Sequence, residues 1–172
     1  ATPVRQYNTS AYTDNRLIEY ASKRGVSYNI LSKYTMQLND RNYTYIALPN
    51  EMGGYAVRNP HFKGQKGSNS FSFFRGVYSD DVLVFEGMFD FLSYYSLSDV
   101  KYSAVVLNTT ANTKKALEVL RVAKNVHLFL DNDEGGRNAT SDITQVIPHA
   151  IDHANYYSNC NDVNEYICNY RK

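Results

Sequence analysis

The sequence has no tryptophan, only two cysteines and no surplus of charge of either sign. Its 18 basic and 17 acidic side chains give a formal net charge of +1, which argues against a uniformly basic nucleic-acid binder and against an acidic tail. Any contact with nucleic acid must therefore come from a local patch. Cys160 and Cys168 are too few for a four-cysteine zinc site, and no secretory context indicates a disulfide. We therefore expect a reducing, cytoplasmic environment.

Long apolar runs are also missing. No segment approaches the roughly 18 consecutive apolar residues of a membrane-spanning helix, and no signal-peptide core stands at the start. The chain begins with Ala1 instead of methionine, so we expect a partial chain. Its 172 residues correspond to one domain, or to one with a small appendage. A domain of this size needs no disulfide or structural metal for stability.

The second half of the sequence alternates short apolar runs with helical patterns. The runs span residues 81–85, 103–107 and 125–130. None of them alternates polar with apolar residues, which is typical of strands buried on both faces of a parallel sheet. Helical spacing follows each run, over residues 89–97, 114–123 and 143–151. Pro148 is expected to bend or end the last helix. The order predicts an α/β fold with an open, mainly parallel sheet flanked by helices.

The first half predicts a small α+β unit. Asp14 is placed to cap a helix that ends at Gly25, and Ser27 is placed to cap a second short helix. The predicted strands span residues 43–48, 55–58 and 70–74, the first two forming a hairpin. We therefore divide the chain into an α+β subdomain, residues 1–78, and an α/β domain, residues 79–172.

Carboxylates follow two of the predicted parallel strands at the point where each strand ends. Glu86 and Asp90 follow the first strand, and Asp131 and Asp133 follow the third. The carboxyl ends of parallel strands share one edge of a sheet, where ligands bind in open α/β folds. Carboxylates gathered there would repel one another unless a cation lies among them, and such hard oxygen ligands suit Mg²⁺ or Mn²⁺.

Two other interpretations of the second acidic segment stay open at this point. Residues 131–136 would also serve as a polar loop that caps the following helix. They partly match a calcium-binding loop, but the glutamate required at its twelfth position is Asp142 here. The two acidic segments together, each closing a strand of the same unit, favour the magnesium or manganese site.

The two acidic segments together resemble the Toprim domain, which bacterial primases, type IA and type II topoisomerases and some nucleases share. The first Toprim motif is a strand followed by Glu-Gly-x-x-Asp, here from Glu86 to Asp90. The second is a strand followed by Asp-x-Asp-x-x-Gly, here from Asp131 to Gly136. The motifs occur in the family's order and separation, and the likeness covers most of residues 80–172.

Within this family the sequence is most similar to bacterial primases, in particular to the primase-like proteins of mobile elements and plasmids. Arg137 completes a Gly-Arg pair like that of primases, and residues 161–166 resemble the primase Lys-Asp-Pro-Asp-Glu-Tyr/Leu segment. Residues 53–64 resemble the stretch that precedes Toprim in primases. Asn161 and Asn164 depart from the family pattern, Asn164 replacing a frequent Asp. The zinc-binding module of such primases is not recognisable, so the resemblance implies a catalytic-core fragment.

The resemblance implies metal-dependent phosphoryl transfer, with RNA primer synthesis on single-stranded DNA as the expected reaction. Asp131 and Asp133, helped by Asp90 or Asp162, are expected to hold one or two Mg²⁺ or Mn²⁺ ions. Glu86 is the expected catalytic residue, either as a proton-transfer group or as a direct metal ligand. The implied partners are single-stranded DNA, ribonucleoside triphosphates and a helicase or zinc-binding domain, with no membrane.

Basic residues near Phe62 form a candidate nucleic-acid surface. Arg58, Lys63 and Lys66 lie in a glycine-rich stretch where phosphate contact and base stacking would suit a single strand. A solvated hairpin loop explains the same residues.

Arg137, after the acidic loop, is expected to pair with a carboxylate or to bind a phosphate. The four histidines have no metal-ligand spacing with the cysteines, and we expect structural roles for them.

Two rival functions use the same residues. A Toprim nuclease would use the same metals with water as the nucleophile, although the primase-type N-terminal subdomain argues against it. A non-catalytic module would bind metal and nucleic acid but need a missing zinc domain or helicase partner to act. Such a module would bind single strands and never extend nucleotides.

Overall fold

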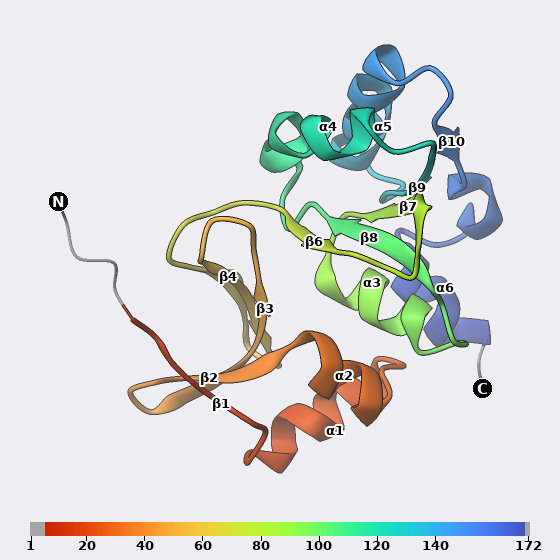
Figure 1. Ribbon diagram of the computed structural model, residues 1–172. Helices are drawn as coiled ribbons and strands as arrows, with labels where there is room; N and C mark the ends of the chain where they lie inside the picture. The colour runs from red at the N-terminus through yellow and green to blue at the C-terminus, as the bar shows by residue number, and fades with distance from the viewer. Residues whose placement is uncertain (1–5, 171–172) are drawn as a thin grey trace, which may run out of the picture.

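The computed structural model describes residues 6–170 and shows two sheets with helices between and around them (Figure 1). The first sheet is antiparallel, in the order β1-β2-β3-β4-β5. Its strands are β1 (Asn8–Ser10), β2 (Met36–Asp40), β3 (Tyr43–Pro49), β4 (Tyr55–Asn59) and β5 (Phe62–Lys66). Two helices, α1 (Asn15–Lys23) and α2 (Tyr28–Tyr34), connect β1 to β2.

The two predicted caps begin these helices. The Asp14 carboxylate accepts a hydrogen bond from the backbone N–H of Arg16, and the Ser27 hydroxyl accepts one from Ile30. Gly25 has a φ of +80°, the left-handed conformation that lets the chain turn sharply between α1 and α2. Local side-chain chemistry thus sets both helix starts and the turn that separates the helices.

The second sheet has the order β10-β9-β7-β8-β6 and is parallel except for β6, which runs antiparallel to β8. Its strands are β6 (Ser72–Phe74), β7 (Tyr78–Phe85), β8 (Tyr102–Val106), β9 (Asn125–Phe129) and β10 (Ile151–Asp152). The helices are α3 (Met88–Tyr95), α4 (Thr113–Arg121), α5 (Glu134–Val146) and α6 (Val163–Tyr170), with short 3₁₀ turns η1 (Thr110–Asn112) and η2 (Ala154–Tyr157). The predicted α/β fold with an open, mainly parallel sheet is confirmed.

Helices cover both faces of the second sheet, with α4 and α5 on one face and α3 and α6 on the other (Figure 1). Alternate residues of β7 divide between them: Val82 and Val84 pack with α4 and α5, whereas Leu83 and Phe85 pack with α3 and α6. Both sets are buried, which explains why the sequence of this strand is continuously apolar.

The first sheet and its helices share a hydrophobic core with the second sheet. Leu31 of α2 and Ile46 and Leu48 of β3 belong to the same buried cluster as Phe85 and Phe91. This shared core fixes the first sheet relative to the acidic edge of the second. The division between residues 78 and 79 stays a prediction.

Four strands and one strand pairing were not predicted from the sequence. The unpredicted strands are β1, β2, β5 and β10, while the predicted strand at residues 70–74 forms β6 and joins the second sheet. The helix that was expected to bend or end at Pro148 ends at Val146, and Ile151 lies in β10. Among the described residues, no helix has the length and apolar character needed to cross a bilayer.

Candidate metal centre

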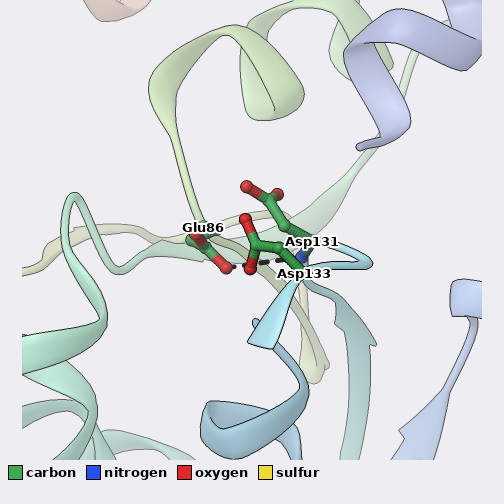
Figure 2. A group of neighbouring side chains, drawn as sticks. All are labelled: Glu86, Asp131 and Asp133. Atoms are coloured by element: carbon green, nitrogen blue, oxygen red, sulfur yellow. Dashed lines mark hydrogen bonds between the residues drawn. The ribbon is translucent and has the colours of Figure 1, made fainter. Parts of the chain in front are cut away.

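Two parallel strands bring the predicted carboxylates together at one sheet edge. Strands β7 and β9 pair with Phe85 opposite Phe129, so the residues that follow them leave the sheet side by side. The backbone N–H of Asp131 donates a hydrogen bond of 3.3 Å to Glu86 Oε1. Figure 2 shows the side chains of Glu86, Asp131 and Asp133 gathered around this contact.

The carboxylates form two groups that share one member. Oxygen atoms of Glu86, Asp131 and Asp133 all lie within 4.8 Å of one another, and so do oxygen atoms of Asp90, Asp131 and Asp162. The structure therefore gathers all five of the acidic residues singled out in the sequence, with Asp131 common to both groups. Such spacing allows one cation to contact three carboxylates in each group.

Asp131 and Asp133 are held by the start of α5. Asp133 caps this helix by accepting a hydrogen bond of 2.8 Å from the backbone N–H of Gly136. A side chain at Gly136 would place its Cβ 2.1 Å from the carbonyl oxygen of Asp131, so only glycine allows this close approach. The side-chain amide of Asn132 anchors the same loop to the carbonyl oxygens of Tyr157 and Cys160.

Asp90 is buried at the start of α3. Its carboxylate accepts hydrogen bonds from the backbone N–H of Gly87, at 3.2 Å, and of Asn164, at 3.1 Å. Burial, together with the nearby charge of Asp162, raises the pKa of Asp90 to about 7. Because α3 begins directly after β7, this helix places Asp90 beside the strand end that carries Glu86.

Asp162 stands at the start of α6 and closes the second group. It accepts a hydrogen bond of 2.8 Å from the backbone N–H of Glu165, and Glu165 accepts one of 2.7 Å from the backbone N–H of Asn161. This reciprocal cap fixes the carboxylate at the helix terminus. The carbonyl oxygen of Asn161 also accepts from the backbone N–H of Asn132, at 2.6 Å, which joins α6 to the acidic loop.

Three carboxyl groups of the acidic edge, those of Glu86, Asp90 and Asp131, have raised pKa values. Burial, with the neighbouring charges of Asp90 and Glu86, raises the pKa of Asp131 to about 9. Burial also raises the pKa of Glu86. In addition, Asp131 Oδ1 is buried with no hydrogen-bond partner. An all-carboxylate donor set with an unsatisfied oxygen fits a hard divalent cation such as Mg²⁺ or Mn²⁺.

Basic side chains share a cleft with the carboxylates. The cleft has a volume of about 300 Å³, and Arg24, Arg58 and Lys63 line it together with acidic residues of both groups. The guanidinium groups of Arg24 and Arg58 lie 4.2 Å and 5.4 Å from the centre of the Phe89 ring. Negative and positive side chains in one cleft suit a ligand that carries both phosphate groups and bound metal.

Arg24 was missed in the sequence because it looks like an ordinary basic residue at a helix end. Its guanidinium donates a hydrogen bond of 3.0 Å to Asn164 Oδ1, and its carbonyl oxygen accepts one of 2.9 Å from the Asn164 amide. Asn164, which replaces a frequent family Asp, is thus buried between α1, α3 and α6 and belongs to neither acidic group. Only the fold brings these two distant residues together.

Two other predicted basic residues lie outside this cleft. Lys66 pairs with Asp40 in the first sheet at 3.0 Å, and its ammonium lies 5.2 Å from the centre of the Tyr45 ring. Arg137 pairs with Asp152 at 2.8 Å and donates to the carbonyl oxygen of Asp131 at 3.2 Å. Arg137 therefore supports the acidic loop from its backbone side.

The histidine pair in the second sheet has partners of its own. His127 hydrogen bonds to Asp81 through Nε2, at 3.1 Å, and to His153 through Nδ1, at 2.9 Å. His153 also stacks on Phe129, with ring centres 4.7 Å apart. These contacts tie β10 and η2 to β9, so they agree with the structural roles that the sequence predicts.

The second half of the chain, with both acidic segments, is similar to a Toprim-like domain. The family model described as Toprim-like matches residues 83–167, and one described as a domain of unknown function (DUF8464) matches residues 7–67. The Toprim resemblance that the two acidic motifs predict is therefore confirmed. No curated protein gives a significant match to the chain.

Solved primase structures share the fold of nearly the whole chain. The primase fragment of the bacteriophage T7 primase-helicase protein has a TM-score of 0.70 at 22% identity, over 95% of this chain and 71% of that chain. A structure of T7 lagging-strand DNA polymerase with primase domains bound to an RNA/DNA hybrid and dTTP gives a TM-score of 0.63 at 21% identity, over 95% and 86%. The zinc-binding and RNA polymerase domains of Aquifex aeolicus primase give 0.54 at 16% identity, over 76% and 46%. The fold is thus that of a primase core.

Proposed function

We propose that this chain is the catalytic core of a primase, which joins ribonucleotides into a short RNA primer on single-stranded DNA. The proposal rests on the two clusters of three carboxylates that share Asp131, and on the buried Asp131 Oδ1 atom, which has no hydrogen-bond partner in the protein. The primase-type fold supports it. Two adjoining groups of carboxylates suit a reaction that must neutralise several phosphate charges at once.

Each carboxylate receives a role from its position in the two groups. Asp131 would contribute to both groups, Asp133 to the first, and Asp90 and Asp162 to the second. Bound Mg²⁺ or Mn²⁺ supplies charge neutralisation at the attacked phosphate. Glu86 belongs to the first group, and its raised pKa suits a residue that accepts a proton from the attacking hydroxyl.

The basic side chains of the cleft would bind phosphates. Arg24, Arg58 and Lys63 line the same space as the carboxylates, so a triphosphate held by the metals would lie within their reach. The exposed Phe62 ring lies on the opposite face of β5 from Lys63, with the Lys66 ammonium 5.9 Å from its centre, and offers a surface on which a template base could stack. We propose that single-stranded DNA passes from the cleft over the edge strand β5 to Phe62 and Lys66.

The test is primer synthesis by the purified chain on single-stranded DNA, paired with Mn²⁺ titration by calorimetry. We expect the wild-type chain to bind Mn²⁺ and to extend ribonucleotides, and the Asp131→Ala/Asp133→Ala variant to lose both properties. An Asp142→Ala variant provides the control, because Asp142 is an exposed carboxylate of α5 outside both groups. Absence of Mn²⁺ binding in the wild-type chain would contradict the proposal.

The same assay separates the rival functions. Cleavage of DNA without primer formation would identify a Toprim nuclease. Binding of metal and single strands without either reaction would identify a module that depends on a zinc-binding domain or a helicase. Adding such a partner and measuring primer synthesis again would then test whether the chain is an incomplete catalyst.

A further inference from the structure

A surface at the far end of the second sheet has no role in the function proposed so far. It contains two hollows, the first with a volume of about 340 Å³ and the second of about 400 Å³, and residues 99–102 line both of them. This segment leads into β8, whose first residue, Tyr102, pairs with Tyr78 at the start of β7. The acidic edge lies at the opposite ends of these strands, so at least the length of β8, about 13 Å, separates the two sites.

The segment that the two hollows share is fixed in place. The carbonyl oxygen of Lys101 accepts a hydrogen bond of 3.0 Å from the backbone N–H of Tyr78. The carbonyl oxygen of Tyr102 accepts one of 2.7 Å from the hydroxyl group of Tyr95. A Cβ atom at Gly76 would collide with the carbonyl oxygen of Lys101, so the link between β6 and β7 packs closely against the same segment. A surface that is already held in one conformation loses little entropy when it binds a partner.

Large apolar side chains are exposed around both hollows. Val77, which lines the second hollow, is 79% exposed. Tyr78 and Leu97, which line the first, are 57% and 45% exposed, and Tyr102, which lines both, is 43% exposed. Exposed apolar side chains that gather in one place mark interaction surfaces, and tyrosine is among the residues enriched where proteins meet.

The second hollow has a wall of aromatic rings that belong to the core. Three of its lining residues pack against the buried ring of Phe91, with ring centres 4.7–5.2 Å from the centre of that ring: Tyr34, Phe74 and Tyr95. Rings held in this way do not move aside when the surface is covered. A rigid aromatic hollow of this kind is typical of the places where a partner buries an apolar side chain.

The charged side chains around the hollows are mainly basic. Lys33, Arg75 and Lys101 line the second hollow, and among the described residues Asp99 is the one acid that lines either hollow. Asp99 pairs with Lys101 at 3.5 Å. Lys33 and Arg75 are exposed and form no ion pair with a described residue. This local surplus of positive charge, in a chain with a net charge of only +1, favours a negatively charged partner.

The distribution of charge favours a peptide over a nucleic acid. Nucleic-acid surfaces present several cations to a row of phosphates. Here the unpaired cations, Lys33 and Arg75, both border the second hollow, whereas the charged residues of the first are the Asp99–Lys101 pair. One neutral apolar hollow beside one basic apolar hollow suits apolar and acidic side chains that alternate along a short segment.

We propose that the two hollows bind an acidic peptide segment of a partner protein. One apolar side chain of the segment would enter each hollow, and carboxylates beside it would contact Lys33 and Arg75. The buried apolar side chains would supply most of the affinity, and the charges would supply selectivity for acidic segments. The partner would be held at the end of the sheet away from the metal cleft, which stays accessible. This inference does not depend on the proposed function.

The experiment measures the binding of a fluorescein-labelled acidic peptide by fluorescence anisotropy. The peptide carries a phenylalanine and a leucine among glutamates and aspartates, with one, two or three aspartates between the two apolar residues. Comparison peptides replace either the apolar residues with alanine or the acidic residues with lysine. We expect micromolar affinity for at least one spacing, and at least about tenfold weaker binding of each comparison peptide. Absence of binding at every spacing, or equal binding of the lysine peptide, would overturn the proposal.

Substitutions of exposed side chains test the apolar and the charged contacts separately. Val77→Ser/Leu97→Ser should weaken binding of the acidic peptide by about tenfold, because it removes apolar contacts in both hollows. Lys33→Gln/Arg75→Gln should weaken it by about fivefold and make it less sensitive to salt. Full affinity in both variants would overturn the site.

Val122→Ser/Lys124→Gln is the matched control. Both side chains are exposed and lie at the end of α4, outside the two hollows. We expect this variant to bind the peptide as the wild-type chain does, and equal losses in the control and in the test variants would overturn the proposal. Because all the replaced side chains are exposed, the three variants should melt within a few degrees of the wild-type chain.

Other occupants of the surface give different results. Displacement of the peptide by oligothymidylate would assign the surface to single-stranded DNA. A dimer in sedimentation that Val77→Ser/Leu97→Ser dissociates would assign it to a second copy of the chain. Either result would overturn the peptide site. Primer synthesis by the same variants should stay at the wild-type level, so the failure of this inference and the failure of the proposed function are distinguishable.

Discussion

At the scale of single residues, Asp131 is the carboxyl group at which burial and repulsion by neighbouring carboxylates combine. It is a member of both carboxylate groups, its pKa is raised to about 9 and its Oδ1 atom has no partner. These properties are unfavourable for the free chain and favourable for a chain that holds a divalent cation. We infer that the strain is retained because it creates the metal site.

Replacing Asp131 with asparagine, its neutral isostere, should therefore make the folded chain more stable and remove its ability to bind a divalent cation. Without divalent ions at pH 8, Asp131→Asn should raise the free energy of unfolding by about 2 kcal/mol, because the wild-type carboxyl group must take up a proton on folding and the neutral amide need not. The same variant should lose Mn²⁺ binding. Urea denaturation and calorimetry measure the two effects. Asp142→Asn should change neither property, and a destabilised Asp131→Asn chain would contradict this account.

Gly136 permits a second test at the residue scale. Gly136→Ala should destabilise the chain by about 1–3 kcal/mol and weaken Mn²⁺ binding, because the new Cβ would collide with the carbonyl oxygen of Asp131. Gly135→Ala is the matched control in the same helix turn, since its nearest neighbour would lie at 3.6 Å, an ordinary contact. Thermal unfolding of both variants decides the matter: equal melting temperatures would refute the close approach.

At the scale of secondary-structure elements, the starts of three helices hold the site. Asp90 lies in the first turn of α3, Asp133 caps α5, and Asp162 caps α6. Carboxylates at helix starts are stabilised by backbone N–H groups and the helix dipole, so each is oriented before a cation binds. The elements thus supply orientation that loop residues alone would lack.

Two substitutions at Asp162 separate its capping role from its charge. Asp162→Asn keeps an acceptor for the N–H of Glu165 but removes the charge, so we expect weaker Mn²⁺ binding at nearly unchanged stability. Asp162→Ala removes both, and its free energy of unfolding should fall by about 1 kcal/mol more. Denaturation curves and Mn²⁺ titrations of the two variants give the comparison. Full Mn²⁺ affinity in Asp162→Asn would exclude Asp162 from the metal site.

The elements that sequence analysis found and missed differ in their local signals. Strands β7, β8 and β9 are buried on both faces, and their apolar runs predict them directly. By contrast, β5 contains lysines and glycine, and β10 has two residues, so neither carries a hydrophobic pattern. Strand β6 was recognised as a strand, but its partner β8 lies about thirty residues away, and no local pattern indicates such a pairing.

At the scale of the whole molecule, the acidic edge should make stability depend on pH. The folded-state pKa of Asp131, about 9, lies above the value of about 4 expected in the unfolded chain. The folded chain therefore binds a proton that the unfolded chain has lost, and stability falls as the pH rises toward 9. We expect a loss of about 1 kcal/mol per pH unit between pH 7 and 9 without divalent ions.

The measurement is urea denaturation at several pH values with and without Mn²⁺. Above pH 7, His153 is mainly neutral in both states, because burial lowers its pKa in the folded chain and its unfolded value is about 6.5, so it adds little to the slope in this range. The Asp131→Asn variant should show a flatter dependence. Saturating Mn²⁺ should reverse the trend in the wild-type chain, since metal ions bind the deprotonated carboxylates. A wild-type slope equal to that of the variant would contradict the assignment.

The two halves of the chain should also be coupled through nucleic-acid binding. Arg58 and Lys63 come from the first sheet but line the cleft that holds the carboxylates of the second. Replacing either with alanine should weaken binding of single-stranded DNA and lower the slope of log affinity against log salt by about 0.7. Lys66→Ala should have a smaller effect, because Lys66 is paired with Asp40. Fluorescence anisotropy at several salt concentrations tests this, and unchanged slopes would exclude the cleft.

The sequence alone determined the parts of this protein that depend on local chemistry. The apolar runs, the caps at Asp14 and Ser27, and the two acidic motifs at strand ends predict an α/β domain with carboxylates at one edge. Tertiary structure decided which groups meet there. Arg24, Asn108 and Thr109 line the cleft, and Asn164 is buried against Arg24, because these residues are distant in sequence and only packing sets their separations.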